Sequence, residues 1–150
     1  MIEQDEPPLR ARESPLVLLV GHCAPDSTML RSAVQRAIPG ARIERINDAR
    51  SLESAHGGAA LLLINRVLDG DFTESSGIDM IERLVAQSQG GPPALVLVSD
   101  RPDAQHRVQA VGALPGFGKA GLHSGETLRR IESACARWPI AKSRPQPRPA

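Results

Sequence analysis

Three short apolar runs, separated by segments of helical periodicity, restrict the fold of this chain more than any other feature. The runs cover residues 15–20, 59–65 and 94–98. Each is continuous rather than alternating, which is typical of strands that are buried on both faces of a parallel sheet. Residues 42–46 alternate between polar and apolar, as an edge strand does, and residues 115–119 are predicted to form a short last strand.

Helical periodicity marks five segments between and after these strands, at residues 26–37, 48–55, 78–89, 102–111 and 124–138. Asp48 and Ser124 are placed to cap two of the helices, and Gly-rich or Pro-Gly pairs end three of them. Five strands that alternate with five helices predict an α/β fold. The expected architecture is a doubly wound, five-stranded parallel sheet with helices on both faces.

The composition limits the classes of function. Aromatic residues make up 2% of the chain and the formal net charge is +1. The core must therefore be aliphatic, and neither base stacking nor a field of one sign favours nucleic acid or a membrane surface as a partner. Two distant cysteines do not form a disulfide framework, and no apolar run approaches about 20 residues. We expect a cytoplasmic protein.

The ends of the chain differ from its middle. Residues 1–14 are acidic at their start, residues 139–150 are rich in Pro and basic side chains, and neither segment shows apolar periodicity. This pattern predicts one folded domain over residues 15–138, with a mobile tail at 1–14 and a disordered tail at 139–150. No role is assigned to the basic tail.

The residues that follow the strands are the candidates for a site, because doubly wound sheets bind ligands at the carboxyl ends of their strands. These residues are Gly21, His22, Cys23, Asn65, Arg66, Ser99, Asp100 and Lys119. His22 and Cys23 are adjacent potential metal ligands, but no second pair at metal spacing accompanies them. No Ser-His-Asp or Cys-His pattern indicates catalysis, so neither a metal nor an enzyme is predicted.

Several of these positions carry a family resemblance. Residues 17–31 (VLLVGHCAPDSTMLR), 60–65 (ALLLIN) and 77–81 (GIDMI) resemble three blocks of the receiver domains of bacterial response regulators. The pair at 112–113, followed seven residues later by Lys119, resembles the last block and its lysine. The resemblance covers about residues 15–137. It implies a flavodoxin-like fold with strand order 2-1-3-4-5 and a role in two-component signalling.

The chain departs from the family at the phosphorylation site. Gly21 and His22 stand where the family has its acidic pair, and Asn65 stands where it has the phosphoryl-accepting aspartate. Phosphoryl uptake needs a carboxylate nucleophile, and Mg²⁺ needs hard oxygen ligands. We therefore expect a pseudo-receiver that binds no Mg²⁺ and takes up no phosphoryl group unless all three carboxylates are restored. An unusual acceptor, Asp69 or Asp71, is an open alternative.

A second alternative is that the altered pocket binds a small anion or a nucleotide. The resemblance implies that Lys119 has lost its carboxylate partner, with His22 and Arg66 nearby. A partly buried ammonium without a partner is costly, so an anion would stabilise it. The predicted contacts are Lys119, Ser99 and Arg66.

The output of the domain is predicted at the face that the family uses, formed by its fourth helix, fifth strand and fifth helix. We do not expect this face to switch between two states, because Gly116 occupies the position where the family has the aromatic residue of its switch. Phe117 follows one residue later and should face the opposite side of the strand. We expect constitutive contact with a protein partner or a second copy. The predicted contact residues are Arg107, Phe117, Arg129 and Arg130.

Overall fold

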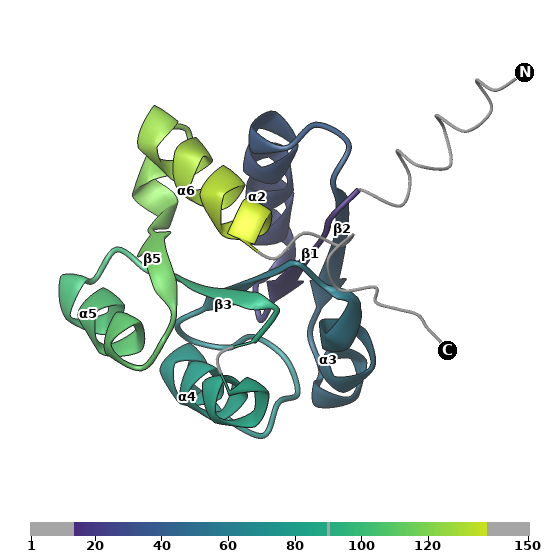
Figure 1. Cartoon of the computed structure of the whole chain (residues 1–150), viewed down its shortest axis with the longest axis vertical. Helices are drawn as coiled ribbons and strands as arrows, with labels where there is room; N and C mark the ends of the chain where they lie inside the picture. The colour runs from purple at the N-terminus through teal and green to yellow at the C-terminus, as the bar shows by residue number, and fades with distance from the viewer. Residues whose placement is uncertain (1–13, 90, 138–150) are drawn as a thin grey trace, which may run out of the picture.

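The apolar runs form the middle of one parallel sheet, whose strand order is β2-β1-β3-β4-β5 (Figure 1). The strands are β1 (Leu16–Val20), β2 (Arg42–Ile46), β3 (Leu61–Asn65), β4 (Ala94–Val98) and β5 (Leu114–Phe117). The structure is a computed structural model that describes residues 14–89 and 91–137. The order confirms the doubly wound prediction. Residues 1–13 and 138–150, which hold nearly all of the two expected tails, lie outside the described residues.

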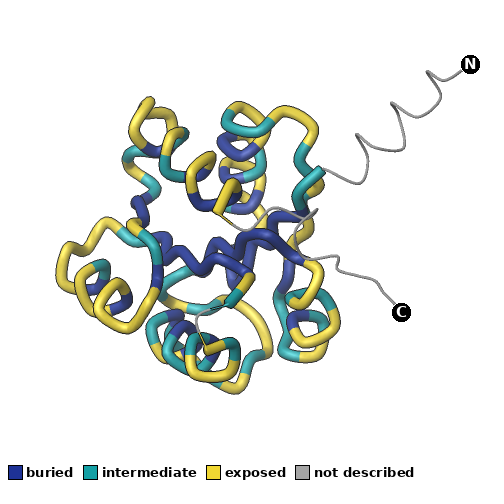
Figure 2. Tube along the Cα trace, in the orientation of Figure 1, coloured by how far each residue is buried: buried dark blue, intermediate teal, exposed yellow. Residues whose placement is uncertain are grey.

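Helices cover both faces of the sheet. They are α2 (Ala24–Ala37), α3 (Ala49–Ala55), α4 (Gly77–Ser88), α5 (Pro102–Ala110) and α6 (Gly125–Arg137), with 3₁₀ turns η2 (His56–Gly58) and η3 (Lys119–Gly121). Helices α2 and α6 pack on one face and α3, α4 and α5 on the other (Figure 1). In Figure 2 the central strands are buried, while the outer sides of the helices are exposed.

The continuous apolar runs supply both layers of the core. In β1, Leu18 packs in the cluster under α3, α4 and α5, while its neighbours Val17 and Leu19 pack under α2 and α6. The same alternation runs through β3 and β4. Each fully buried leucine contributes about 1.5–3 kcal/mol relative to an exposed one. Asn65, the last residue of β3, is the polar end of an otherwise buried apolar strand.

The predicted helix caps are confirmed. The Asp48 carboxylate accepts a hydrogen bond from the Ser51 backbone N–H at 2.8 Å, and the Ser124 hydroxyl accepts one from the Thr127 N–H at 3.1 Å. Helix α2 begins at Ala24, two residues before the predicted start, because a proline is tolerated in a first turn. Asp26 therefore lies inside the first turn of α2, at the carboxyl edge of the sheet.

Strand β5 departs most from the prediction. Val96 pairs with Leu114 and Val98 pairs with Phe117, so β5 holds one residue more than β4 over the same span. This register shift is a β-bulge, and the strand ends at Phe117. Lys119 therefore lies in η3 rather than in the last strand, where it was predicted.

The side chain of Gln105, on α5, fills the bulge. Its Nε2 donates to the carbonyl oxygens of Leu97 at 2.9 Å and Ser99 at 3.1 Å, and its Oε1 accepts from the Gly116 N–H at 3.1 Å. From the other face of the sheet, Arg130 donates to the Gly116 carbonyl oxygen. The peptide groups that the bulge removes from the ladder are thus paired by side chains of α5 and α6.

Candidate functional site

The ends of β3, β4 and β5 surround a pocket of about 320 Å³ at the carboxyl edge of the sheet. It is lined by Asn65, Arg66, Val67, Val98, Ser99, Asp100, Arg101 and Lys119. The structure thus brings together five of the residues that the strand ends predicted, including all three expected anion contacts. It does not place Gly21, His22 or Cys23 on the wall of this pocket.

Asn65 acts as a hydrogen-bond donor toward two loops. Its Nδ2 donates to the carbonyl oxygens of Gly21 at 3.0 Å and Val67 at 2.8 Å. Its Oδ1 lies 3.4 Å from the Lys119 ammonium. The reverse orientation of the amide would set oxygen against two carbonyls and NH₂ against a cation, so the neighbours fix the orientation. A deprotonated carboxylate at this position could not make the two donor bonds.

Lys119 is not left without a carboxylate, and that expectation is wrong. Its Nζ lies 2.7 Å from Oδ2 of Asp26, and both side chains are about one-third exposed or less. Lys119 holds the pKa of Asp26 below its usual value, mainly through this hydrogen bond. Sequence motifs gave no reason to choose Asp26. The start of the helix could have indicated Asp26, because the first turn of α2 lies at the same edge of the sheet as the carboxyl ends of the strands.

His22 is buried behind the pocket rather than exposed in it. Its side chain has no exposed surface, and its Nε2 lies 2.9 Å from the carbonyl oxygen of Leu63. Its Nδ1 has no hydrogen-bond partner in the described part of the chain. Burial lowers the pKa of His22 to about 4, so the ring is neutral at physiological pH. His22, which was expected near Lys119, therefore adds no positive charge to the pocket.

Gly21 cannot readily be replaced by a residue that has a carboxylate. Its φ of +78° is in the left-handed region, and a Cβ built there would lie 2.6 Å from Cδ2 of Leu68. The Gly21 carbonyl also accepts from the Asp69 N–H at 2.9 Å, which holds the two loops together. A Gly21→Asp change would thus strain the backbone and displace Leu68. Restoring all three carboxylates is structurally harder than the sequence suggested.

The basic side chains that line the pocket differ in whether an acidic side chain pairs with them. Arg101 is paired with Asp103 at 3.2 Å, and both side chains are largely exposed. Asp100 contributes a carboxylate that accepts from the Ala120 N–H at 3.4 Å. Arg66 is half-buried, and no acidic side chain within residues 14–89 and 91–137 pairs with it. Arg66 is therefore the wall cation most available to a bound anion.

The acidic loop before α4 does not reach the pocket. Asp69 and Asp71 are exposed and do not line its wall. Glu74 is paired with Arg83 of α4, whose guanidinium lowers the pKa of that carboxyl. The two candidate acceptors thus do not line the pocket that Lys119 lines.

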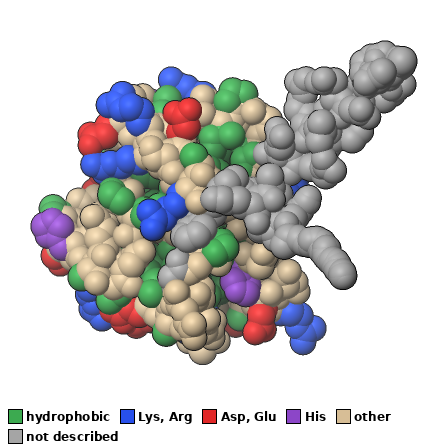
Figure 3. All heavy atoms as spheres, in the orientation of Figure 1, with side chains coloured by type: hydrophobic (Ala, Val, Ile, Leu, Met, Phe, Trp, Pro, Cys, Tyr) green, Lys and Arg blue, Asp and Glu red, His purple; other side chains and the backbone are tan. Residues whose placement is uncertain are grey.

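The predicted interface residues Phe117 and Arg107 lie in different environments. Phe117 points away from the side of Gly116, as expected, but it is only 6% exposed and packs in the core under α2 and α6. Its burial contradicts its assignment as a contact, and the alternation of side chains along the strand accounts for its direction. Arg107 is exposed and paired with Glu82 of α4 at 3.1 Å. Figure 3 shows basic and acidic side chains gathered over the region of α6.

The described chain holds no cluster of three or more His, Cys, Asp or Glu side chains that could hold a metal ion. Among the helices of residues 14–89 and 91–137, none combines the length and the apolar character needed to cross a membrane.

Comparison with known proteins places the fold. No protein-family model matches the sequence, and no curated protein is significantly similar to it. Among solved structures, the signal receiver domain of a DNA-binding response regulator from Colwellia psychrerythraea is 15% identical, with a TM-score of 0.64 over 80% of this chain and 97% of that one. The receiver domain of a Francisella response regulator is 14% identical, with a TM-score of 0.62 over 83% and 98% of the two chains.

A chemotaxis response regulator of Vibrio cholerae is similar in the same way. It is 17% identical, with a TM-score of 0.55 over 83% of this chain and 98% of that one. At such identities the likeness establishes the fold and not the activity. The chain has the receiver fold of two-component response regulators, with the strand order that the resemblance implied.

Proposed function

We propose that this chain is a signalling module of receiver fold that binds a protein partner without being phosphorylated. The hydrogen bonding of Asn65 carries the proposal. Its position needs an N–H donor toward the carbonyls of Gly21 and Val67, and an acceptor aspartate is not a donor when ionised. The side chain that would receive a phosphoryl group is instead a structural link between two loops.

The residues at the edge of the sheet also do not fit Mg²⁺. The ion requires several oxygen ligands, usually with at least one carboxylate. After β1 the chain offers a glycine and His22, a fully buried neutral ring whose Nε2 bonds to a backbone carbonyl. Asp26 is paired with Lys119 instead. No step of the proposed function passes through a metal.

The rigidity of β5 supports constitutive rather than switched binding. Gln105 and Arg130 hold the Gly116 peptide from opposite faces, and Phe117 is buried. A strand clamped in this way has no exposed aromatic to move when a neighbouring site changes. We therefore assign the output to the face formed by α5, β5 and α6 in a single binding state.

Incubation with acetyl phosphate and Mg²⁺ is expected to leave the mass of the protein unchanged, because the acceptor carboxylate is absent. Intact-mass spectrometry checks this, with a phosphorylatable receiver domain treated in parallel as a positive control. A stoichiometric phosphoryl adduct would overturn the proposal. If the adduct mapped to Asp69 or Asp71, it would establish the atypical-acceptor alternative instead.

A small-anion sensor is the second candidate, because Arg66, Ser99 and Lys119 line one pocket. Since Lys119 already has a carboxylate partner, Arg66 becomes the expected main contact. Sulfate or phosphate should raise the melting temperature of the parent, and Arg66→Ala should abolish most of that rise. Arg50→Ala, at an exposed arginine on α3, serves as the control. Equal shifts in all three proteins would exclude this candidate.

A further inference from the structure

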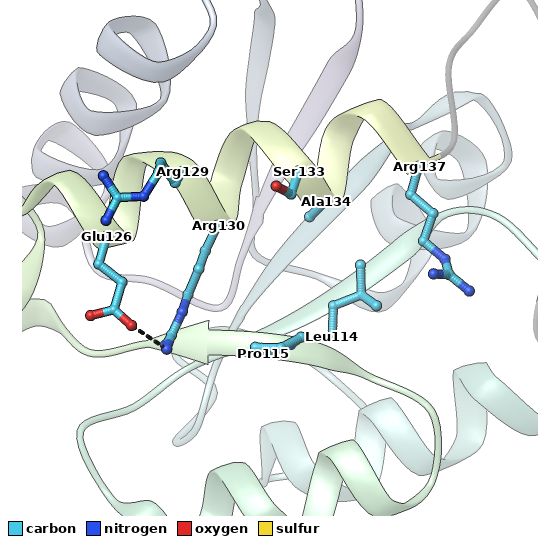
Figure 4. Close-up of a pocket in the computed structure, with 8 residues that line it drawn as sticks. All are labelled: Leu114, Pro115, Glu126, Arg129, Arg130, Ser133, Ala134 and Arg137. Atoms are coloured by element: carbon cyan, nitrogen blue, oxygen red, sulfur yellow. Dashed lines mark hydrogen bonds and ion pairs between the residues drawn. The ribbon is translucent and has the colours of Figure 1, made fainter.

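A groove of about 610 Å³ lies between β5 and α6 (Figure 4). It is lined by Leu114, Pro115, Glu126, Arg129, Arg130, Ser133, Ala134 and Arg137. Figure 4 shows Leu114 and Pro115 along β5, with the side chains of α6 projecting beside them. The lining residues of α6 run from position 126 to position 137, which corresponds to roughly 16 Å of helix.

Arginines outnumber acidic side chains on the wall of the groove. Three of its lining residues are arginines and one is an acid, and that acid, Glu126, is paired with Arg130 at 2.6 Å. Arg129 is exposed, and no described acidic residue forms an ion pair with it. A partly apolar floor beside basic side chains is complementary to an acidic segment with some apolar side chains.

The edge of β5 is closed to an added strand. Pro115 has no N–H, and both the N–H and the carbonyl of Gly116 are occupied by Gln105 and Arg130. Strand addition depends on a row of free backbone groups, which this edge lacks. An occupant must therefore be held by its side chains.

A second copy of the chain is a poor occupant. In a two-fold contact each surface meets itself, so the arginines of one groove would face those of the other. Like charges that face each other across an interface oppose association. The single acidic residue of the groove, Glu126, is already paired with Arg130. Charge thus favours a different protein over self-association.

We propose that this groove docks an acidic segment of a partner protein through side-chain contacts, with Arg129 as a central determinant. The inference rests on the proposed function, since it supplies the partner that replaces phosphorylation. It also narrows the output face to its β5–α6 side, because Arg107 is paired with α4 and Phe117 is buried.

The test uses the full chain, labelled with ¹⁵N, and a synthetic helical peptide of about 14 residues with glutamates one turn apart and leucines beside them. The peptide should shift the amide signals of Leu114, Ser133 and Ala134. Arg129→Glu should weaken binding roughly tenfold or more. Arg50→Glu, the matched exposed control on α3, should leave the affinity unchanged. A peptide with lysines in place of the glutamates should not bind.

Three outcomes would overturn the inference: no shift in the groove at about 1 mM peptide, equal affinities for the two variants, or concentration-dependent shifts of the same signals without peptide. The last would show that a second copy occupies the groove. Failure here is distinct from failure of the proposed function. A phosphoryl adduct would contradict the proposed function whether or not the peptide binds. If no adduct forms and the peptide does not bind, only the proposal that the groove docks a partner is contradicted.

Discussion

Asn65→Asp is expected to destabilise the protein rather than to restore phosphoryl uptake. The substitution sets a carboxylate oxygen in place of Nδ2, against the carbonyl oxygens of Gly21 and Val67 that now accept at 3.0 and 2.8 Å. The loss of both bonds and the new repulsion should lower the free energy of unfolding by about 2–4 kcal/mol, with Lys119 offsetting part of it. Equilibrium urea denaturation at neutral pH measures the difference.

The matched control is Asn65→Ala, which removes the same bonds without adding a charge. Its expected loss is smaller, about 1–2 kcal/mol. Acetyl phosphate should leave Asn65→Asp unmodified in the mass spectrometer. An aspartate variant as stable as the parent would contradict the donor role of Asn65, and a phosphorylated one would contradict the need for further carboxylates.

Acidification should destabilise the folded state through His22. The pKa of His22 is about 4 in the folded protein against its ordinary value of 6.5, because burial disfavours the imidazolium. Between these pH values the unfolded chain binds a proton that the folded chain does not. The free energy of unfolding therefore falls as pH falls, by about 1.4 kcal/mol per unit and about 3 kcal/mol in all. Urea denaturation at a series of pH values measures this slope.

The control for this slope is His22→Gln, whose amide can still donate to the Leu63 carbonyl but does not titrate near neutral pH. Its stability should be nearly constant between pH 6.5 and 5. The pKa values of Asp26 and Glu74 are lowered in the folded protein. These two carboxylates therefore affect stability only at a lower pH, below their ordinary pKa values, where they become protonated and their stabilising charge is lost. The same slope in parent and variant would show that His22 is not the titrating group.

The fold could be predicted because its signals are local. A continuous apolar run indicates a strand buried on both faces, and β1, β3 and β4 are buried almost throughout. Cap residues such as Asp48 and Ser124 act within one turn of chain, so their sequence positions are enough. The β5 bulge could not be predicted, because Gln105 makes it tolerable from another element.

The site could be predicted only as a set of positions. Strand order placed Asn65, Ser99 and Lys119 at one edge, and they line one pocket. The pairing of charges was missed because Asp26 belongs to a helix distant in the sequence from Lys119. The depth at which His22 is buried could not be fixed from the sequence, because a residue just after a strand can point either to the edge or into the core. Only the packing of the loops decides that direction.

The donor role of Asn65 has an evolutionary consequence. Under the proposed function, a change from asparagine to aspartate would supply an acceptor carboxylate in one step, yet the carbonyls of Gly21 and Val67 oppose it. The next step, at Gly21, meets a left-handed backbone and the side chain of Leu68. Because natural domains have only about 5–15 kcal/mol of stability, each intermediate toward a set of carboxylates is poorly tolerated. We expect descendants of this chain to refine their binding surface rather than to acquire a phosphoryl switch.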